Sequence, residues 1–393
     1  MAAGNWSFSP VNGKAHSKLQ TRRRHCTLSL MKSSIRASAP AAVTIDAPAR
    51  LHMGFLDLGG SLGRVFGGIG VALNEIATRI SLRPAGQLAV HGPSAERGGI
   101  IARRIEQAWR LPLTAEISIE EAIPEHVGLG SGTQLALAIG VGLHRLYGSG
   151  SPVREVARIV ERGKRSGIGI SVFEQGGFIV DGGRGPQTVT PPLLARFEFS
   201  SQWRFILVFD SRGQGLHGDR ELDAFRTLPP YPVAEAAHLC HILLLRGLPA
   251  IAEHDLPAFG AVISEIQSSV GDYFAPVQGG RFTSPDVAEV LRWLESQGAA
   301  GIGQTSWGPT GFCIAGNPSE AARLAEEARS RFSGNPHLSL VVASARNYGA
   351  AIDVSHRDFH SEFEPSGLQD LGRYREHRDT SSFSPSPRGR RPG

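Results

Sequence analysis

The sequence predicts an α+β fold with two domains. Its 393 residues are enough for about two domains of ordinary size, and 41% hydrophobic with 20% charged residues is typical of chains that bury a core. Along the chain, segments in which every second residue is apolar, as in strands, alternate with segments whose apolar residues have helical spacing. Gly, Pro and Thr cluster at 184–202, and we expect the domain boundary there.

The first half is expected to begin with two strands, at 43–55 and 68–82. In the second of them Ile69, Val71 and Leu73 alternate with small residues. The segment 94–110 carries apolar residues at helical spacing and is predicted to form a helix. A strand at 115–119, helices at 132–147 and 152–162 and a strand at 178–181 complete this half.

The second half is predicted to begin with a strand at 203–210, WRFILVFD, which is apolar enough for the centre of a sheet. A helical stretch at 232–270, interrupted near 247–249 by Gly and Pro, comes next. The remaining predicted elements are a helix at 285–297, strands at 300–306 and 311–315, a helix at 318–332 and a strand at 338–345.

The two ends of the chain differ in composition from the part between them. Residues 1–41 are rich in Ser, Arg and Ala, which is typical of an organelle transit peptide. The alternative, which we favour because no amphipathic apolar face is evident, is an over-long gene model with translation starting at Met31. Residues 355–393 show no periodicity and are expected to be a disordered tail. The predicted domains are therefore 42–190 and 191–354.

The net charge of +5 comes from the ends, because residues 46–354 contain 27 basic and 30 acidic residues. This balance disfavours a nucleic-acid-binding domain. No apolar run reaches the ~18 residues of a membrane span. Cys26, Cys240 and Cys313 form no CxxC pair, which excludes a disulfide scaffold and a Cys-based zinc site. We expect a cytoplasmic protein with small-molecule partners.

The glycine-rich segment 124–136, PEHVGLGSGTQLA, predicts a phosphate site. Its glycines allow successive N–H groups to face one concavity, and the helix that follows adds partial positive charge. The spacing is that of neither a Walker nor a Rossmann loop. The alternative is a plain helix cap in which Ser131 satisfies the first amides. The candidate ligands are Gly128, Leu129, Gly130, Ser131, Gly132, Thr133 and Gln134.

A second segment, 47–73, places polar side chains beside another glycine-rich turn. Arg50 and His52 leave the same face of the predicted strand, while Asp57 and Arg64 flank the turn. This set suits a phosphorylated ligand, with Asp57 as a metal ligand. The alternative is that these side chains face solvent or are paired structurally.

A third segment, 301–314 (GIGQTSWGPTGFCI), concentrates amide and hydroxyl groups. We expect Gln304, Ser306 and Thr310 to contact a ligand and Trp307 to form a stacking wall for an aromatic substrate. The alternatives are an ordinary hairpin and a core tryptophan.

In order and spacing, the three segments resemble the GHMP kinase superfamily over about residues 44–350. Pro124, Gly128, Leu129, Gly130 and Ser131 match the superfamily's Pro-x-x-x-Gly-Leu-Gly-Ser-Ser-Ala motif, but Gly132-Thr133 replaces the Ser-Ala pair. The resemblance implies a two-domain GHMP-kinase-like fold, with a ribosomal S5 domain 2-like N-terminal half and a ferredoxin-like C-terminal half.

The catalytic Asp of the superfamily's kinases has no equivalent here, because Ile168 stands about where it is expected. An isoleucine cannot accept a proton, which argues against kinase chemistry. Three blocks, RLHMGFLDLGGSLGRVFGGIGVAL, RSGIGISVFEQGGFIVDGG and GQTSWGPTGF, resemble the β-ribofuranosylaminobenzene 5′-phosphate synthases, which share the fold without being kinases.

This second resemblance implies a decarboxylating pentosyltransferase. Phosphoribosyl pyrophosphate condenses with 4-aminobenzoate or 4-hydroxybenzoate, releasing CO2 and pyrophosphate, in tetrahydromethanopterin biosynthesis and one-carbon metabolism. The alternatives are an ATP-dependent small-molecule kinase using Glu174 as its acid, and a non-catalytic binding protein, although the glycine loops are intact. A homodimer is compatible with the fold.

The reaction implies roles for particular residues. We expect the 128–134 loop with Mg2+ to stabilise the departing pyrophosphate and Arg50, His52 and Arg64 to contact phosphates. Glu174 or Asp181 would favour the ribosyl cation, unless these are surface or capping carboxylates. Candidate walls that exclude water are Phe173, Phe178 and Trp307; further anion-binding candidates are Arg184, Arg212, His217 and Arg220.

Overall fold

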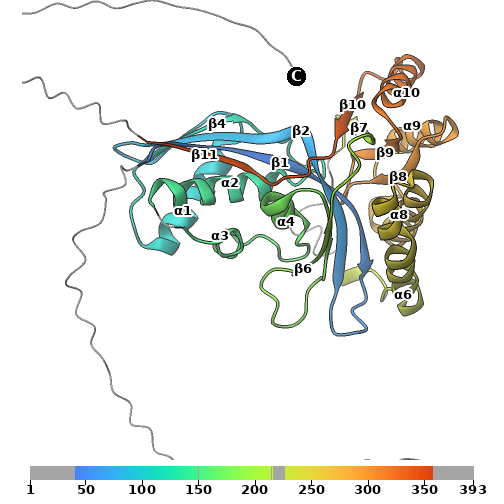
Figure 1. Cartoon of the computed structure of the whole chain (residues 1–393), viewed down its shortest axis with the longest axis horizontal. Coiled ribbons are helices and arrows are strands. Elements are labelled where there is room, and N and C mark those ends of the chain that lie inside the picture. The colour runs from blue at the N-terminus through green and yellow to red at the C-terminus, as the bar shows by residue number, and fades with distance from the viewer. Residues whose placement is uncertain (1–39, 149, 214, 216–225, 357–393) are drawn as a thin grey trace, which may run out of the picture.

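The computed structural model describes residues 40–148, 150–213, 215 and 226–356. The expectations for nearly all of 1–41, for the tail beyond 356, and for His217 and Arg220 lie outside these residues. Two sheets lie side by side in Figure 1, each with its own helices, and the long strands β1 and β2 extend from the first sheet towards the second.

The first sheet has seven strands around a long antiparallel ribbon. Its strands are β1 (Pro40–Asp57), β2 (Phe66–Pro84), β3 (Ala89–His91), β4 (Ala115–Glu121), β5 (Phe178–Asp181), β6 (Leu193–Phe197) and β11 (Ala351–His356). The order is β11-β1-β2-β4-β3, with β5 joining β2 to β6. Pairing of β1 with β2 runs from Val43 opposite Leu82 to Asp57 opposite Phe66, so the ribbon spans the whole sheet.

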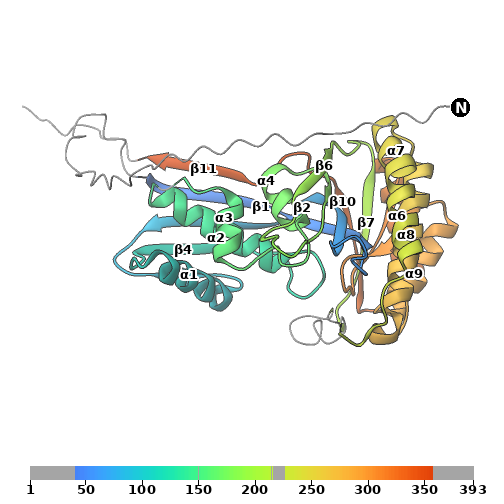
Figure 2. The same cartoon turned by 90° about the horizontal axis from the view of Figure 1, so that it is seen from below.

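Four helices cover one face of this sheet, as Figures 1 and 2 show. They are α1 (Ala95–Trp109), α2 (Ser131–Leu146), α3 (Val153–Ile159) and α4 (Ile168–Gln175). Ile45 of β1 and Leu82 of β2 pack in one buried cluster with Leu135 and Ile139 of α2. Gly142 lets α2 approach β2, because a side chain there would meet Leu82. Burial of this face fixes the start of α2 against the strands.

The second sheet is antiparallel and covered on both faces. Its strands β7 (Arg204–Asp210), β8 (Ala300–Gln304), β9 (Gly311–Ala315) and β10 (Leu338–Ser344) have the order β10-β7-β9-β8. In β7, Phe205 and Leu207 join the core with α8 (Leu256–Gln278), whereas Ile206 and Val208 pack with α9 (Pro285–Ser296) and α10 (Pro318–Arg331). Because both faces of β7 are covered, its residues 205–209 are all apolar and do not alternate with polar ones.

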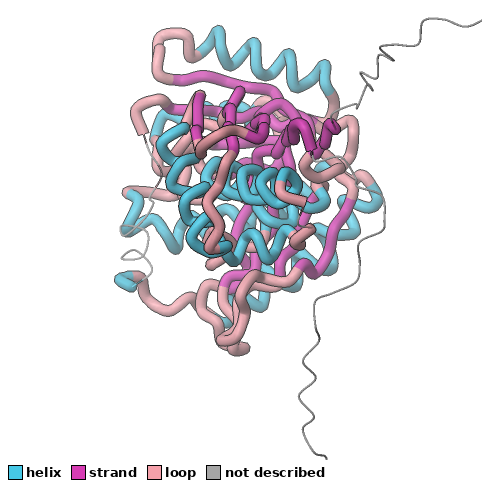
Figure 3. The backbone as a smooth tube through the Cα atoms, turned by 90° about the vertical axis from the view of Figure 1, so that its left-hand side faces the viewer, coloured by secondary structure: helices cyan, strands magenta, loops and turns pink. Residues whose placement is uncertain are grey.

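The two halves share a core. Leu51 and Met53 of β1 belong to the same buried cluster as Phe259, Ile263 and Ile266 of α8. Gly54, with φ of 139°, makes the close approach possible, because a side chain there would meet Ile266. The β1–β2 ribbon therefore carries residues of the first sheet to the helices of the second. Figure 3 views the molecule from the side of the first sheet, with helices in front of the strands.

Most predicted elements are confirmed, and two of them, β5 and β9, match residue for residue. The predicted interruption near 247–249 is wrong. A π-helical segment, η1 (Leu243–Gly247), joins α6 (Val233–Ile242) to α7 (Leu248–Glu253), and the break follows at His254, with φ of 60°. Pro249 stands in the first turn of α7, directly after the π-helical segment.

Four elements were not expected from the sequence: β3, β6, β11 and α4. The first two are short, and β11 is largely exposed at the sheet edge, so none has a clear alternating pattern. The helix α4 is apolar nearly all round because it is buried on most sides. β6 extends the first sheet beyond residue 190, and β11 continues two residues into the segment 355–393.

Candidate active site

The glycine loop before α2 has a backbone that only glycine accommodates readily. Gly128 and Gly130 have φ of 80° and 81°, and a side chain on Gly128 would collide with the carbonyl of Thr305. Gly130 is the N-cap residue of α2 and no side chain caps the helix, so Ser131 does not act as a cap. The amides of Ser131 and Gly132 precede the first hydrogen bonds of the helix and are suited to hold an anion.

Residues from all three predicted segments fasten this loop. Arg50 donates from Nη1 to the Gly128 carbonyl at 2.6 Å and from its backbone N to the Leu129 carbonyl at 3.1 Å. Thr305 Oγ1 donates to the same Gly128 carbonyl at 2.9 Å and accepts from the backbone N of His52 at 3.0 Å. The loop, β1 and the 305–310 turn therefore form one hydrogen-bonded unit.

A cavity of about 170 Å³ lies beside the glycine loop. Its lining combines loop residues with basic side chains and the 306–308 turn: Arg97, His126, Gly128, Gly130, Ser131, Gly132, Thr133, Arg162, Gly215, Ser306, Trp307 and Gly308. The guanidinium of Arg97 occupies the space that a side chain on Gly132 would fill. Glu125 holds this guanidinium at 3.2 Å. Gly132, where the superfamily motif has Ser, thus makes room for a cation.

Arg162 adds a second cation to this cavity. Burial lowers the pKa of its guanidinium, and the neighbouring positive charges of Arg97 and Arg104 lower it further. Like charges held together in a partly buried place favour the binding of a polyanion. Arg97 and Arg162 are not evident from the sequence, because α1 and the turn after α3 carry no motif around them. His126 lies within the glycine-rich segment 124–136 but was not among the predicted ligands.

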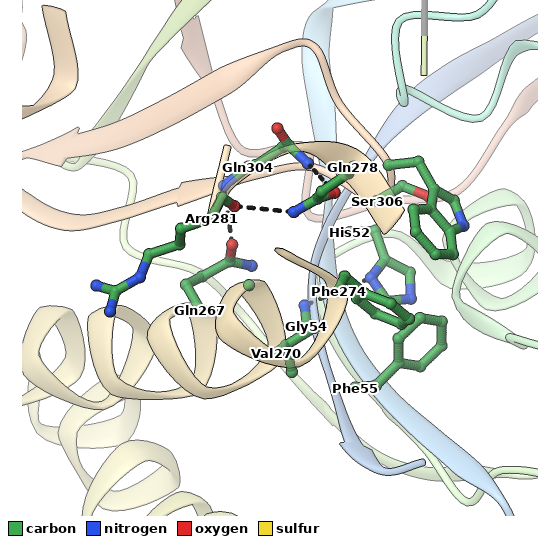
Figure 4. Close-up of a pocket in the computed structure, with 12 residues that line it drawn as sticks. His52, Gly54, Phe55, Gln267, Val270, Phe274, Gln278, Arg281, Gln304 and Ser306 are labelled. Carbon is green, nitrogen blue, oxygen red and sulfur yellow. Dashed lines mark hydrogen bonds between the residues drawn. The ribbon is translucent and has the colours of Figure 1, made fainter. Parts of the chain in front are cut away.

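A second pocket opens between β1, α8 and the turn after β8 (Figure 4). It is lined by His52, Gly54, Phe55, Gln267, Val270, Gly271, Phe274, Gln278, Arg281, Gln304, Ser306 and Trp307. Phe274 packs against Trp307 with ring centroids 4.3 Å apart and the ring planes tilted by 52°. The free space is about 20 Å³, which is room for little more than a water molecule, so an aromatic guest requires these side chains to move.

Ser306 and Trp307 line both pockets, so the two pockets meet at this turn. Ser306 has φ of 56°, a left-handed conformation that is strained for a residue with a side chain. The expected hairpin is present, since β8 pairs with β9, and its loop also faces both pockets. Trp307 is both a packed tryptophan and a pocket wall.

The glutamines of the second pocket tie its walls together. Gln267 on α8 donates to the Met53 carbonyl at 2.7 Å and accepts from the backbone N of Gln304 at 2.8 Å. The side-chain oxygen of Gln304 accepts from Thr283 N at 2.7 Å. Thr310 is buried and closes the turn by accepting the backbone N–H of Thr305 at its carbonyl. Gln134 is also buried, where it donates to the Gly169 carbonyl of α4.

His52 is an uncharged, buried member of the second pocket. Burial, together with the positive charge of Arg50, holds the pKa of its imidazole well below the usual range. Its Nδ1 accepts the backbone N–H of Gly54 at 3.4 Å, and its Nε2 is buried with no hydrogen-bond partner among the described residues.

Asp181, at the end of β5, binds the start of α4. Its Oδ2 accepts from Ser166 Oγ at 3.0 Å and from Gly167 N at 2.9 Å, while Oδ1 accepts from Gly183 N at 2.8 Å. Burial raises the pKa of this carboxyl, although these hydrogen bonds act in the opposite direction. The carboxylate is 1% exposed and holds a helix terminus beside His52.

Three predicted site residues lie away from both pockets. Glu174 is in the last turn of α4, where it pairs with Arg154 at 3.1 Å. Asp57 caps the β1–β2 turn by accepting from Gly59 N and Gly60 N, seven residues beyond Arg50 along the strand. Arg64 donates to the carbonyls of Gly182 and Gly183. The structure does not bring these three to the glycine loop.

The other expected contacts have structural partners as well. Phe173 lies in the core beneath α2, and Phe178 packs edge-on against Phe259, so neither lines a pocket. Arg184 donates to the Lys164 carbonyl, and Arg212 pairs with Asp210 and Asp286. Of the 211–221 segment, only Gly215 lines the first pocket among the described residues.

The donor set at the loop suits an anion better than a metal ion. Among the described residues, no group of three or more His, Cys, Asp or Glu side chains is placed to hold a metal. Glu125, the carboxylate beside the first pocket, is engaged by Ser94 Oγ at 2.7 Å and by Arg97. Amides and guanidinium groups therefore dominate the lining that the structure describes.

Comparison with known proteins identifies the fold. Residues 97–177 match the family model "GHMP kinases N terminal domain", and residues 248–334 match "GHMP kinases C terminal". Homoserine kinase from Cytophaga hutchinsonii superimposes with a TM-score of 0.58 at 14% identity, covering 83% of this chain and 100% of that one. Mevalonate diphosphate decarboxylase from Staphylococcus aureus gives a TM-score of 0.58 at 15% identity, covering 80% and 98%. The protein has the GHMP-kinase fold.

Closer relatives define the family. β-Ribofuranosylphenol 5′-phosphate synthase from Archaeoglobus fulgidus is 32% identical over 323 residues, which is 79% of this chain and 99% of the relative. The proteins of that name from Methanothermobacter thermautotrophicus and Methanocaldococcus jannaschii are 33% and 30% identical, covering 69% and 78% of this chain and 88% and 99% of the relatives. The chain belongs to the β-ribofuranosylphenol 5′-phosphate synthase family.

No helix in the part of the chain that the structure describes is both long and apolar enough to span a bilayer.

Proposed function

We propose that this protein condenses phosphoribosyl pyrophosphate with 4-hydroxybenzoate or 4-aminobenzoate, releasing CO2 and pyrophosphate and forming a C-riboside 5′-phosphate. The observation that carries the proposal is the meeting of a cationic pocket and an aromatic pocket at Ser306 and Trp307. The name of the three relatives specifies a phenol product, which favours the hydroxyl substrate.

The cationic pocket is suited to the diphosphate. Cleavage of the bond between ribose C1 and the pyrophosphate oxygen transfers negative charge to the leaving group, where the amides of Ser131 and Gly132 and the guanidinium groups of Arg97 and Arg162 are placed to stabilise it. The loop amides are fixed before the reaction, because Arg50 and Thr305 hold the loop. No proton donor is needed for this step.

The aromatic pocket is suited to the benzoate once its side chains move to admit the ring. Attack on C1 by the ring carbon that bears the carboxylate forms the carbon–carbon bond, and the electron pair of the departing CO2 then restores aromaticity. Phe55, Phe274 and Trp307 supply apolar walls that exclude water from the ribosyl cation. The buried Ile168 at the start of α4 agrees with a reaction that uses no general base there.

The kinase alternative receives no support from the position of Glu174. This residue lies six positions after Ile168 in the chain, pairs with Arg154 and lines neither pocket. A role for Asp181 near the ribose stays a prediction. Mg2+ also stays a proposal, in which the ion enters with the diphosphate rather than in a protein site. A cytoplasmic location and a homodimer remain predictions from the sequence.

Release of CO2 tests the proposal. Purified protein is incubated with Mg2+, phosphoribosyl pyrophosphate and carboxyl-labelled 4-hydroxybenzoate or 4-aminobenzoate, and a parallel reaction contains ATP in place of the sugar donor. We expect labelled CO2 only with the sugar donor. ATP consumption without CO2 from either acid would contradict the proposal and restore the kinase alternative.

A further inference from the structure

Three side-chain polar atoms face the place where Gly68 has no side chain. A Cβ atom built on Gly68 would lie 3.2 Å from Asp181 Oδ2, 3.3 Å from His52 Nε2 and 3.5 Å from Ser166 Oγ. His52 and Asp181 are 2% and 1% exposed, whereas Ser166 is only half-buried. We call the position beside Gly68 that these three atoms face the Gly68 niche. It is closed to solvent, so a ligand atom enters it only when neighbouring side chains move.

The hydrogen-bonding capacity of the Gly68 niche suits a hydroxyl group. His52 Nδ1 accepts from Gly54 N, as Figure 4 shows, so the proton of the neutral imidazole is on Nε2. That N–H donor is buried without a partner among the described residues. Ser166 Oγ donates to Asp181 and accepts from Ile168 N, which leaves one of its lone pairs available. One face of the niche donates and the other accepts.

The Gly68 niche lies beside the proposed diphosphate site. His52 is two residues from Arg50 on the same strand face, and its backbone N donates to the Thr305 hydroxyl that holds the glycine loop. On the other side, Ser166 and Gly167 immediately precede α4, and Gly169 of α4 packs against Thr133 of the loop. A sugar whose C1 diphosphate lies on the loop is therefore adjacent to the niche.

We propose that the Gly68 niche binds a ring hydroxyl of the ribosyl substrate, which accepts a hydrogen bond from His52 Nε2 and donates one to the Ser166–Asp181 pair. This inference rests on the proposed function, because it needs a sugar diphosphate as the ligand. It gives Asp181 a positioning role through Ser166. It also means that binding of the sugar requires glycine at position 68.

Calorimetric titration with two ligands tests the proposal. Phosphoribosyl pyrophosphate contains the sugar, and inorganic pyrophosphate does not. Gly68→Ala places a methyl group in the niche, and we expect it to raise the dissociation constant of phosphoribosyl pyrophosphate about tenfold while leaving that of pyrophosphate within about twofold. Gly86→Ala is the control, since a Cβ on Gly86 meets nothing within 4 Å.

A second pair of variants covers the case in which Gly68→Ala disturbs folding. His52→Gln retains an N–H donor near the position of Nε2, and His52→Phe does not. We expect His52→Gln to bind phosphoribosyl pyrophosphate several-fold more tightly than His52→Phe, with equal affinities for pyrophosphate. Wild-type affinity in Gly68→Ala, or equal losses in the two His52 variants, would mean that the niche holds only water and would overturn the proposal.

The same measurements distinguish this inference from the proposed function. If wild-type protein binds the sugar diphosphate and releases CO2 while Gly68→Ala behaves identically, the niche proposal fails and the function stands. If wild-type protein neither binds the sugar diphosphate nor releases CO2, both fail.

Discussion

Arg50 donates a hydrogen bond of 2.6 Å from its guanidinium to the carbonyl of Gly128, 78 positions away in the chain. This bond joins the first strand to the loop that precedes α2. The aliphatic part of Arg50 also lies against Gly130, where a Cβ would be 2.8 Å from its Cγ. The side chain thus supports the two glycines of the loop that have positive φ.

Arg50→Ala tests this support. Loss of a charge-assisted hydrogen bond leaves the Gly128 carbonyl with Thr305 as its remaining support, so the loop amides lose their fixed orientation. We expect the KM for phosphoribosyl pyrophosphate to rise roughly 10- to 100-fold. Arg323→Ala, which removes an exposed guanidinium on α10, is the matched control and should leave KM unchanged. Unaltered kinetics in Arg50→Ala would refute its role in holding the loop.

Gly132→Ser introduces the residue of the superfamily motif and displaces Arg97. The guanidinium of Arg97 occupies the site of the new side chain, and because it is the end of a flexible side chain, we expect the protein to remain folded. We expect the affinity for inorganic pyrophosphate to fall roughly tenfold, and Arg97→Ala to show a similar loss. Equal affinities of wild type and both variants in calorimetric titration would show that Arg97 does not contact the diphosphate.

The order of elements could be predicted because the apolar spacing of each long segment is clear. The edge strands β6 and β11 of the first sheet could not be predicted, because their side chains are partly or largely exposed. Their pairing with β5 and β1 is determined by distant parts of the chain. Burial of α4 on most sides likewise removed the helical periodicity that would have indicated it.

The site was predictable where backbone chemistry demands particular residues. Gly128 and Gly130 were identified because a loop that presents its amides needs positive φ. Arg97 and Arg162 were missed because an arginine on an ordinary helix or turn has no distinguishing neighbours in the sequence. Asp57 was assigned to a metal on its proximity to glycines, yet those glycines donate their own N–H groups to its carboxylate.

Arg346→Met is expected to destabilise the protein. The guanidinium of Arg346 is nearly fully buried, donates to Asp46 Oδ1 at 2.6 Å and also bonds the carbonyls of Asp46 and Gly349. Removing it leaves Asp46 Oδ1 and two carbonyls without this buried donor, at a cost of about 3 kcal/mol in the free energy of unfolding. Arg79→Met removes the other, half-exposed partner of Asp46 and should cost less than about 1 kcal/mol. Equal losses of unfolding free energy in the two variants, measured by urea unfolding, would contradict this assignment.

The His52 imidazole predicts how stability depends on pH. Its pKa is held well below 6.5 by burial and by Arg50, so below about pH 6.5 the unfolded chain binds a proton that the folded protein excludes. This contribution is complete above that pH and is lost as the pH falls towards the folded-state pKa. We expect the free energy of unfolding to fall between pH 6.5 and 5 less steeply in His52→Gln than in the wild type. Parallel curves from urea titrations would argue against a buried neutral imidazole.

Phe274→Leu separates the two substrates. Phe274 packs against Trp307 in the second pocket and does not line the cavity beside the glycine loop. Its loss therefore weakens contacts to an aromatic ring without reaching the diphosphate. We expect the KM for the benzoate substrate to rise about three- to tenfold, as for the loss of one aromatic contact, with the KM for phosphoribosyl pyrophosphate unchanged. Phe332→Leu, which alters a ring packed near Trp293 on the other side of the second sheet, is the control. Steady-state rates of CO2 release, measured with each substrate varied in turn, provide both constants. An equal rise in both KM values would show that the two pockets do not bind separate substrates. A change in the second pocket would then affect both substrates through the turn that the pockets share.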